Sequence, residues 1–176
     1  YPHSLGLLYS AITHYMGWKH HCDEGIIMGL APYGDSSKKI PGHKKSYKKI
    51  FEEILTNKGN FQYKLDLDYI DYYSKRDKWV TNKFIKIFGP KRNWKDPLTI
   101  HHKNIAAALQ DQLESVVLKQ LKIARKKFKF DKLCLAGGVA LNCSLNGKIA
   151  KSKIFKEIFI QPASGDDGCA YGATLL

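Results

Sequence analysis

Two glycine-cornered bends carry the residues of this 176-residue sequence that could hold a ligand. The first bend follows the short apolar run Leu133–Leu135 and contains Gly137 and Gly138. Neither glycine has a Cβ atom, so the backbone can turn sharply and approach a ligand closely. The residues that follow predict a helix, whose N-terminal N–H groups and dipole would suit a phosphate. A bare Gly-Gly pair leaves open the alternative of a tight strand-to-helix turn whose glycines serve packing only.

The second bend reads Gly-Asp-Asp-Gly and spans Gly165–Gly168. Two acidic side chains between two glycines can bind a cation or orient a ligand. The alternative is that Asp166 or Asp167 only caps the helix that follows, and this alternative is favoured because Asp is among the commonest capping residues. If the bends do form a site, we expect them to meet across a cleft.

Glu24 ends a run of metal-binding residue types, His-His-Cys-Asp-Glu. Adjacent side chains do not face each other on a helix and point to opposite faces on a strand, so the run has no metal-ligand spacing. We therefore favour a connector over a metal site here. Glu24 leads into an apolar stretch, where a carboxylate would interact with the N-terminus of a helix.

The four cysteines form no C-x-x-C pair, and three of them lie in apolar or glycine-rich stretches. Buried free thiols in a reducing cytoplasm fit this usage better than a zinc site or a disulfide framework. The residues concerned are Cys22, Cys134, Cys143 and Cys169.

The formal net charge is +13. A basic surface can attract nucleic acid or anionic substrates, but lysine can also simply solvate the outer faces of a protein. Lys greatly outnumbers Arg, the better reader of bases, so the solvated surface is favoured and nucleic acid is the less favoured partner. No apolar run is long enough to span a membrane and no signal peptide is evident, so we expect a cytoplasmic protein without a membrane partner.

Apolar periodicity outlines the elements that must position the two bends. The longest predicted helix, over 101–130, leads directly into a buried strand at Leu133–Leu135. We predict further helices over 4–17, 23–31, 46–57 and 169–176, a helical stretch over 68–88, strands over 61–67 and 154–160, and a loop over 89–98.

Three stretches together resemble one family, the carbamoyltransferases of nodulation-factor and antibiotic biosynthesis. These include the nodulation-type and the cephem and tobramycin O-carbamoyltransferases. The stretches lie at both ends of the chain, and residues 35–99 do not contribute to the resemblance. They read SLGLLYSAITHYMG with DEGIIMGLAPYG, LCLAGGVALNCSLNGKI, and FIQPASGDDGCAYGATLL.

The resemblance implies an α/β fold of the actin/hexokinase/Hsp70-like (ribonuclease H-like) type, related to the protein that transfers threonylcarbamoyl to tRNA. The chain would be its second half-domain with a helical insertion. Residues 1–34 would begin the catalytic-domain fragment. Residues 35–99 would form a mostly helical, basic insertion over the main fold, lining an opening. Residues 100–176 would form the nucleotide-binding core with both bends.

The resemblance also implies an activity. In the family, a neighbouring domain makes carbamoyl-adenylate from carbamoyl phosphate and ATP, and the domain seen here would pass the carbamoyl group to a hydroxyl of a small metabolite. The sequence contains nothing like a Ser-His-Asp triad, so we infer direct transfer without an acyl-enzyme. Fixed N–H donors could hold the phosphate, while the acceptor hydroxyl needs positioning.

Four residues match nucleotide-binding positions of the family. Gly137 and Gly138 match the glycines beside the nucleotide phosphates, and Asn142 matches an Asn that contacts the nucleoside. Glu24 matches an acidic residue that approaches the ribose or adenylate. Family members commonly carry Lys where this chain has Ile26, so a polar contact is missing there.

The resemblance further implies a divalent metal ion, namely iron, that is held by two His of an H-x-x-x-H motif and by one Asp. Asp166 matches that Asp. None of the seven histidines occurs in the motif, so we expect the His pair upstream of Tyr1, outside this chain. The chain alone would then hold an incomplete metal site and be inactive.

Two alternatives stay open at this point. One keeps the chemistry but places it on tRNA, as in threonylcarbamoyl transfer, and its support is the basic charge. The other is a non-catalytic nucleotide-binding module. The acceptor and the oligomeric state are also open, a homodimer included.

Overall fold

The computed structural model describes residues 1–74 and 78–175, which fall into two compact units. The first unit comprises residues 1–58 and 62–116, and the second comprises residues 59–61 and 117–176. Helix α5, Ile100–Phe128, runs from the first unit into the second. Within the described residues, none of the helices combines the length and apolar character that crossing a bilayer requires.

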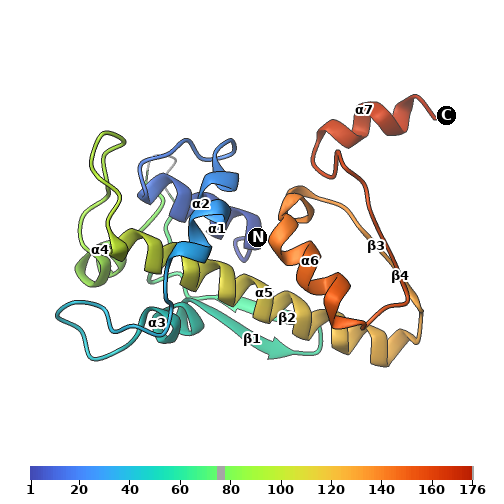
Figure 1. Cartoon of the computed structure of the whole chain (residues 1–176), viewed down its shortest axis with the longest axis horizontal. Coiled ribbons are helices and arrows are strands. Elements are labelled where there is room, and N and C mark those ends of the chain that lie inside the picture. The colour runs from blue at the N-terminus through green and yellow to red at the C-terminus, as the bar shows by residue number, and fades with distance from the viewer. Residues whose placement is uncertain (75–77, 176) are drawn as a thin grey trace. The chain divides into compact units, whose positions relative to one another are not determined.

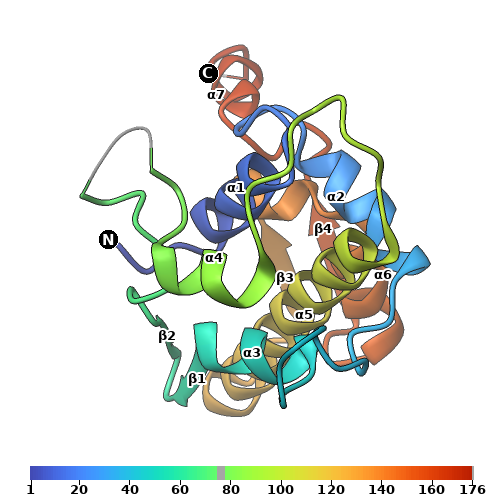
Figure 2. The ribbon, with the colours of Figure 1, turned by 90° about the vertical axis from the view of Figure 1, so that its left-hand side faces the viewer.

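The first unit is mainly helical (Figures 1 and 2). Local capping explains where several of its helices begin, because a hydroxyl oxygen accepts a hydrogen bond from a first-turn N–H group. Ser4 accepts from the Leu7 amide at 3.2 Å, and Ser46 accepts from the Lys49 amide at 3.2 Å. The elements are α1 (Leu5–Tyr15), α2 (Glu24–Leu30), η1 (Ala31–Tyr33), α3 (Tyr47–Ile54), β1 (Leu55–Gly59), β2 (Gln62–Leu65), α4 (Asn82–Phe88) and the first part of α5.

Aromatic side chains fill the core of the first unit. Tyr15 packs edge-on against Phe84 with ring centroids 4.9 Å apart, and its hydroxyl donates to the Phe88 carbonyl oxygen at 2.8 Å. Burial raises the pKa of the Tyr15 hydroxyl far above its ordinary value. Phe84 and Phe88 of the 35–99 segment therefore share one core with α1.

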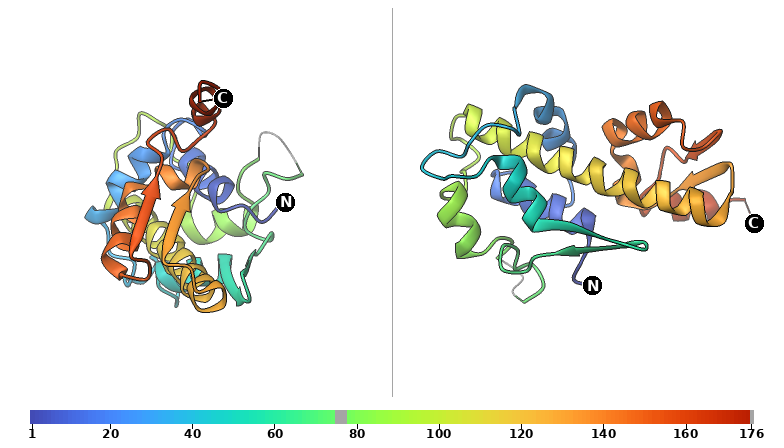
Figure 3. Two further views of the ribbon diagram at one scale, coloured as in Figure 1. Left: turned by 90° about the vertical axis from the view of Figure 1, so that its right-hand side faces the viewer. Right: turned by 90° about the horizontal axis from the view of Figure 1, so that it is seen from below.

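The second unit is built on two parallel strands, β3 (Lys132–Leu135) and β4 (Glu157–Ile160) (Figure 3). Between them lie η2 (Gly138–Leu141) and α6 (Cys143–Ser152), and α7 (Asp167–Ala173) follows β4. Parallel strands require such a crossover connection. The core of this unit contains Leu121, Leu145, Ile149 and Phe155, against which Leu133, Leu135 and Ile158 pack.

The structure confirms the helices predicted near residues 4–17, 23–31 and 101–130 and the loop after Gly89, and it corrects four other elements. The helix predicted over 46–57 ends at Ile54, because residues 55–59 enter a hairpin. Of the helical stretch predicted over 68–88, only α4 is helical; Ile70 bridges to Val80, and residues 75–77 lie outside the described part. The strand predicted over 154–160 begins at Glu157, because Lys153 ends α6 with a left-handed conformation. The last predicted helix lies at Asp167–Ala173.

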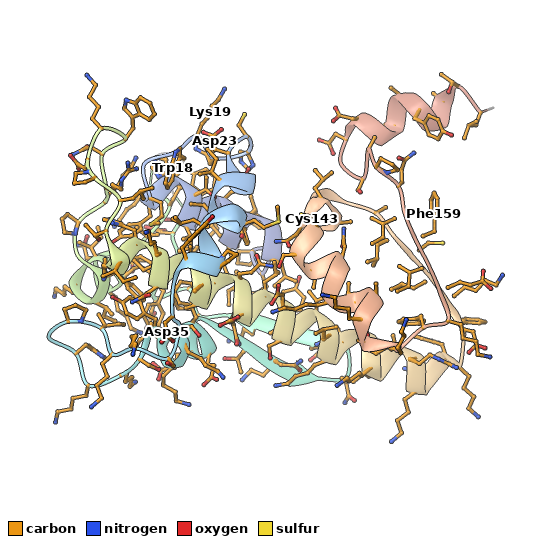
Figure 4. All side chains as sticks on the ribbon, viewed as in Figure 1. Trp18, Lys19, Asp23, Asp35, Cys143 and Phe159 are labelled. Atoms are coloured by element: carbon orange, nitrogen blue, oxygen red, sulfur yellow. The ribbon has the colours of Figure 1, made fainter. Side chains whose placement is uncertain are left out.

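The predicted burial of the second unit is wrong in one respect. Only one face of the β3–β4 pair packs on the helices, so Leu133 and Leu135 are half-buried while Cys134 is exposed. Phe159, labelled on β4 in Figure 4, is 62% exposed because it lies opposite Cys134, on the face that does not pack on the helices. The structure likewise corrects the prediction of buried thiols, since all four cysteines are exposed.

Candidate functional site

The two glycine-cornered bends begin at the same edge of the β3–β4 pair. In the parallel register, Leu135 lies opposite Ile160, so both strands end level with each other. The segment containing Gly137 leaves β3 at the edge where the segment leading to Asp166 leaves β4. Ligands in α/β folds bind outside the carboxyl ends of such strands.

One main-chain hydrogen bond joins the bends directly. The Gly137 N–H group donates to the Ser164 carbonyl oxygen at 2.7 Å. Ser164 is only 5% exposed, and its hydroxyl donates to the Gln161 carbonyl oxygen, which fixes the loop between β4 and Asp166. A Cβ on Gly165 would lie 3.6 Å from Leu141 Cδ1. The two bends therefore adjoin each other, while the cleft and the nucleotide expected between them stay predictions.

The two glycines of the first bend differ in what they require. Gly137 has φ +96° and ψ 161°, a region that is essentially restricted to glycine. A Cβ on either Gly137 or Gly138 would meet no atom of the described chain within 4 Å, so the space beside the bend is open. The Gly137 N–H group is already used by Ser164. The donors left for a phosphate are those of Gly138 and Val139, in the first turn of η2.

Asn142 occupies the junction between η2 and α6. Its side-chain oxygen accepts a hydrogen bond from the Leu145 amide at 2.9 Å and so caps α6. Nearby, the Asn146 side-chain nitrogen donates to the Ala140 carbonyl oxygen at 2.7 Å. The structure thus gives the Asn142 oxygen a structural role in addition to the nucleoside contact that the resemblance implies.

The second bend leaves the Asp166 carboxylate uncommitted to capping. Asp166 occupies the N-cap position of α7, as the favoured alternative predicted, but its side chain makes no capping hydrogen bond. The turn is held instead by main-chain bonds, from the Gly168 amide to the Gly165 carbonyl oxygen and from the Cys169 amide to the Asp166 carbonyl oxygen, both at 3.1 Å. Both Asp166 and Asp167 are exposed.

The residues around Asp166 do not form a complete metal site. Across residues 1–74 and 78–175, no group of three or more His, Cys, Asp or Glu side chains could hold a metal ion. The described residues therefore do not fit the iron that the resemblance implies, and Asp166 alone cannot retain it. The His-His-Cys-Asp-Glu run likewise forms no such group.

Glu24 lies in the first unit, whereas both bends lie in the second. Its Oε1 accepts hydrogen bonds from the Ser10 hydroxyl at 2.5 Å and from the His21 amide at 2.7 Å. Glu24 is the first residue of α2, as predicted for an acidic residue at a helix N-terminus. Asp23, which precedes Glu24 in the sequence, and Lys19 are both labelled in Figure 4, and the Lys19 amide donates to Asp23 Oδ2 at 2.9 Å.

Three histidines surround Trp79 in the same unit, an arrangement that the sequence did not reveal. The His20 ring lies 4.3 Å from Trp79 and 5.4 Å from His14 between centroids, and His14 Nε2 lies 2.8 Å from Lys91 Nζ. Burial and then the neighbouring His21 lower the pKa of His20. Ser164 was missed as well, because only the fold brings it to Gly137.

The sequence model of the family described as "Carbamoyltransferase N-terminus" matches residues 1–175. The chain is 42% identical over 177 aligned positions to an uncharacterized protein, sll1178, of Synechocystis sp., covering 99% of this chain and 27% of that protein. It is 38% identical to nodulation protein NolO of Bradyrhizobium diazoefficiens and 40% identical to nodulation protein NolNO of Sinorhizobium fredii. These matches cover 98% of this chain and 28% and 22% of the relatives, respectively. The chain thus spans about a quarter of the length of the curated relatives it matches.

Proposed function

The chain belongs to the carbamoyltransferase family, and from that premise we propose that it is part of an O-carbamoyltransferase. The enzyme passes a carbamoyl group from carbamoyl-adenylate, made from carbamoyl phosphate and ATP, to a hydroxyl of a small metabolite. The observation that carries this proposal is the pairing of the family match with two adjoining bends at the carboxyl ends of parallel strands.

The bends supply fixed dipoles for an acyl transfer. In the proposed reaction the acceptor oxygen attacks the carbamoyl carbon, the bond from that carbon to the AMP phosphate oxygen breaks, and AMP leaves with the electron pair. The proton of the acceptor hydroxyl passes to water. Gly138 and Val139 are the first two residues of η2, and their N–H groups would face the phosphate. The hydrogen bond between Gly137 and Ser164 fixes the conformation of the bend. Donors that need no reorganisation are the most effective ones for developing charge.

We extend the proposal to the fold. The β3–η2–α6–β4 segment is a parallel strand–helix–strand unit, as an actin/hexokinase/Hsp70-like fold requires. Parallel strands in proteins are normally covered on both faces, and the exposed Cys134 and Phe159 lie on a face that further elements of such a fold would cover. An iron bound through Asp166 belongs to the proposal only with ligands from outside this chain.

The test is an assay of the full-length enzyme for AMP release. It is given ATP and carbamoyl phosphate with a panel of sugars and aminoglycosides, with and without added iron(II). Acceptor-dependent AMP release, with a carbamoylated product found by mass spectrometry, supports the proposal. If ATP raises the thermal stability but no acceptor yields product, the chain belongs to a non-catalytic nucleotide-binding module instead.

A further inference from the structure

The tip of the β1–β2 hairpin and the end of α5 form a second feature of interest. The connection is the two residues Asn60 and Phe61, both with positive φ (46° and 63°). A left-handed conformation is unusual for a bulky aromatic residue, and such outliers often mark functional positions. The Phe61 ring lies 5.6 Å from the Phe128 ring between centroids, and Lys127 Nζ lies 5.3 Å from the Phe61 ring.

The end of α5 carries a stripe of lysines. Lys119, Lys122 and Lys126 follow one another at intervals of three and four residues, which places them on one helical face. All three are exposed, and among the described residues none of them forms an ion pair. From Val117 to Phe130 the sequence contains no acidic residue. The last lysines of a helix complement its dipole, but Lys119 and Lys122 lie more than one turn from the end, where that effect has faded.

An open hollow of about 490 Å³ lies between the hairpin tip and this helix. Its volume falls within the range of small-molecule pockets. It combines an aromatic ring, a side-chain amide and two ammonium groups, and it shares no residue with the two glycine bends. The lining residues are Asn60, Phe61, Ile123, Lys126 and Lys127.

We propose that this surface binds single-stranded nucleic acid. A base stacks on Phe61 in the hollow, and successive phosphates of the strand follow the lysines from Lys126 toward Lys119. Base–aromatic stacking beside a positively charged track is the general mode of sequence-tolerant strand binding. The track continues beyond the hollow, so it offers more phosphate contacts than a single nucleotide would use. The proposal is independent of the carbamoyl-transfer function.

The test measures fluorescence anisotropy of a labelled oligonucleotide of about 12 nucleotides with the full chain. The Lys122→Gln/Lys126→Gln variant should bind at least tenfold more weakly than wild type at moderate salt. Its salt slope should fall by about 1.4, since each lost phosphate contact removes about 0.7. The matched control, Lys44→Gln/Lys48→Gln, removes two exposed lysines of the first unit and should stay within about twofold of wild type. Equal losses in both variants would overturn the proposal.

A second variant tests the role of the Phe61 ring without disrupting the β1–β2 turn. Phe61→Gly creates Asn-Gly, the sequence preferred by two-residue hairpins with positive φ at both positions. We expect unchanged circular dichroism and affinity reduced about fivefold or more through lost stacking. Unchanged affinity would overturn the proposal. Two other results would also overturn the proposal. If ATP displaces the oligonucleotide and affinity does not depend on strand length, the hollow binds a free nucleotide. If the chain binds only phosphatidylserine vesicles, the lysines contact a membrane surface.

Discussion

The Gly137 amide and the Ser164 carbonyl oxygen lie 2.7 Å apart and form the hydrogen bond that joins the two glycine-cornered bends. The strands leading into these bends end in register, at Leu135 and Ile160. Two segments separated by more than twenty residues of sequence thus share one piece of backbone structure. This main-chain hydrogen bond holds the two bends together without a ligand.

Replacing Gly137 by Ala should destabilise the protein. The backbone at Gly137 adopts φ +96°, ψ 161°, and a residue with a Cβ in this region costs about 1–3 kcal/mol. The free energy of unfolding, measured with urea, should fall by this amount, and AMP release should fall with it. An unchanged free energy of unfolding would mean that the bend does not adopt this conformation.

Replacing Gly138 by Ala should separate stability from activity. A Cβ at this position would meet no atom of the described chain within 4 Å, and Gly138 lies in η2 with an ordinary φ. The free energy of unfolding should therefore change by less than about 0.5 kcal/mol. If the nucleotide approaches the bend as proposed, the added methyl group occupies its space, and KM for ATP should rise. Wild-type kinetics would place the nucleotide elsewhere.

The two neighbouring acidic residues offer a matched pair of variants. Asp166 makes no capping hydrogen bond, and Asp167 stands in the first turn of α7, where its charge complements the helix dipole. With the other iron ligands supplied from outside this chain, as proposed, Asp166→Asn should lower acceptor-dependent AMP release by about 10–100-fold, because it removes the anionic ligand that this chain contributes. Asp167→Asn should retain activity within a few-fold and lose at most about 1 kcal/mol of stability. The reverse ranking in the AMP assay would assign the function to Asp167.

Two glycines of the first unit should respond to alanine in opposite directions. A Cβ on Gly34 would overlap the main-chain carbonyl group of Lys103, so Gly34→Ala must displace backbone and should lower the melting temperature by several degrees. Gly29 lies inside α2 with no atom within 4 Å of its Cβ position, so Gly29→Ala should stabilise the helix by about 0.5–1 kcal/mol. Differential scanning calorimetry distinguishes the two, and equal shifts would contradict the close approach at Gly34.

Sequence patterns were most informative where the cause of structure is local. Ser4 and Ser46 mark the starts of α1 and α3 because a hydroxyl reaches the first turn of its own helix. The stretch after residue 68 was misread as helical, since the bridge between Ile70 and Val80 is a long-range contact that periodicity does not encode. The exposure of Cys134 depends in the same way on which face of β3 the helices cover.

For the candidate site, as for the fold, the sequence indicated the local features but not the long-range contacts. The glycine pattern of the two bends and the family resemblance led us to expect that the bends of Gly137 and Asp166 meet, and the structure joins them through Ser164. The sequence could not reveal that the Gly137 N–H group is already bonded, because the acceptor belongs to Ser164 on another strand's loop. The net charge of +13 could not show that Lys126 and Lys127 line one hollow with Phe61, because that proximity exists only in three dimensions.

The histidines around Trp79 should make stability depend on pH. Burial and then His21 lower the pKa of His20 in the folded protein, while Lys91 and Lys19 act in the same direction and Glu24 opposes them. The unfolded chain, with a His pKa of about 6.5, then binds more protons than the folded chain just below that pH. Stability is therefore complete above about pH 6.5 and falls as the pH is lowered toward the folded pKa.

His20→Gln removes this titration while keeping a polar side chain of similar length. Melting temperatures measured between about pH 5 and 8 should show a smaller loss on acidification in the variant than in wild type. His102, whose pKa is also lowered by burial, contributes its own slope in both proteins. The difference between the two curves therefore isolates His20. Parallel curves would show that protonation of His20 does not oppose folding and that the packing against Trp79 tolerates the charged ring.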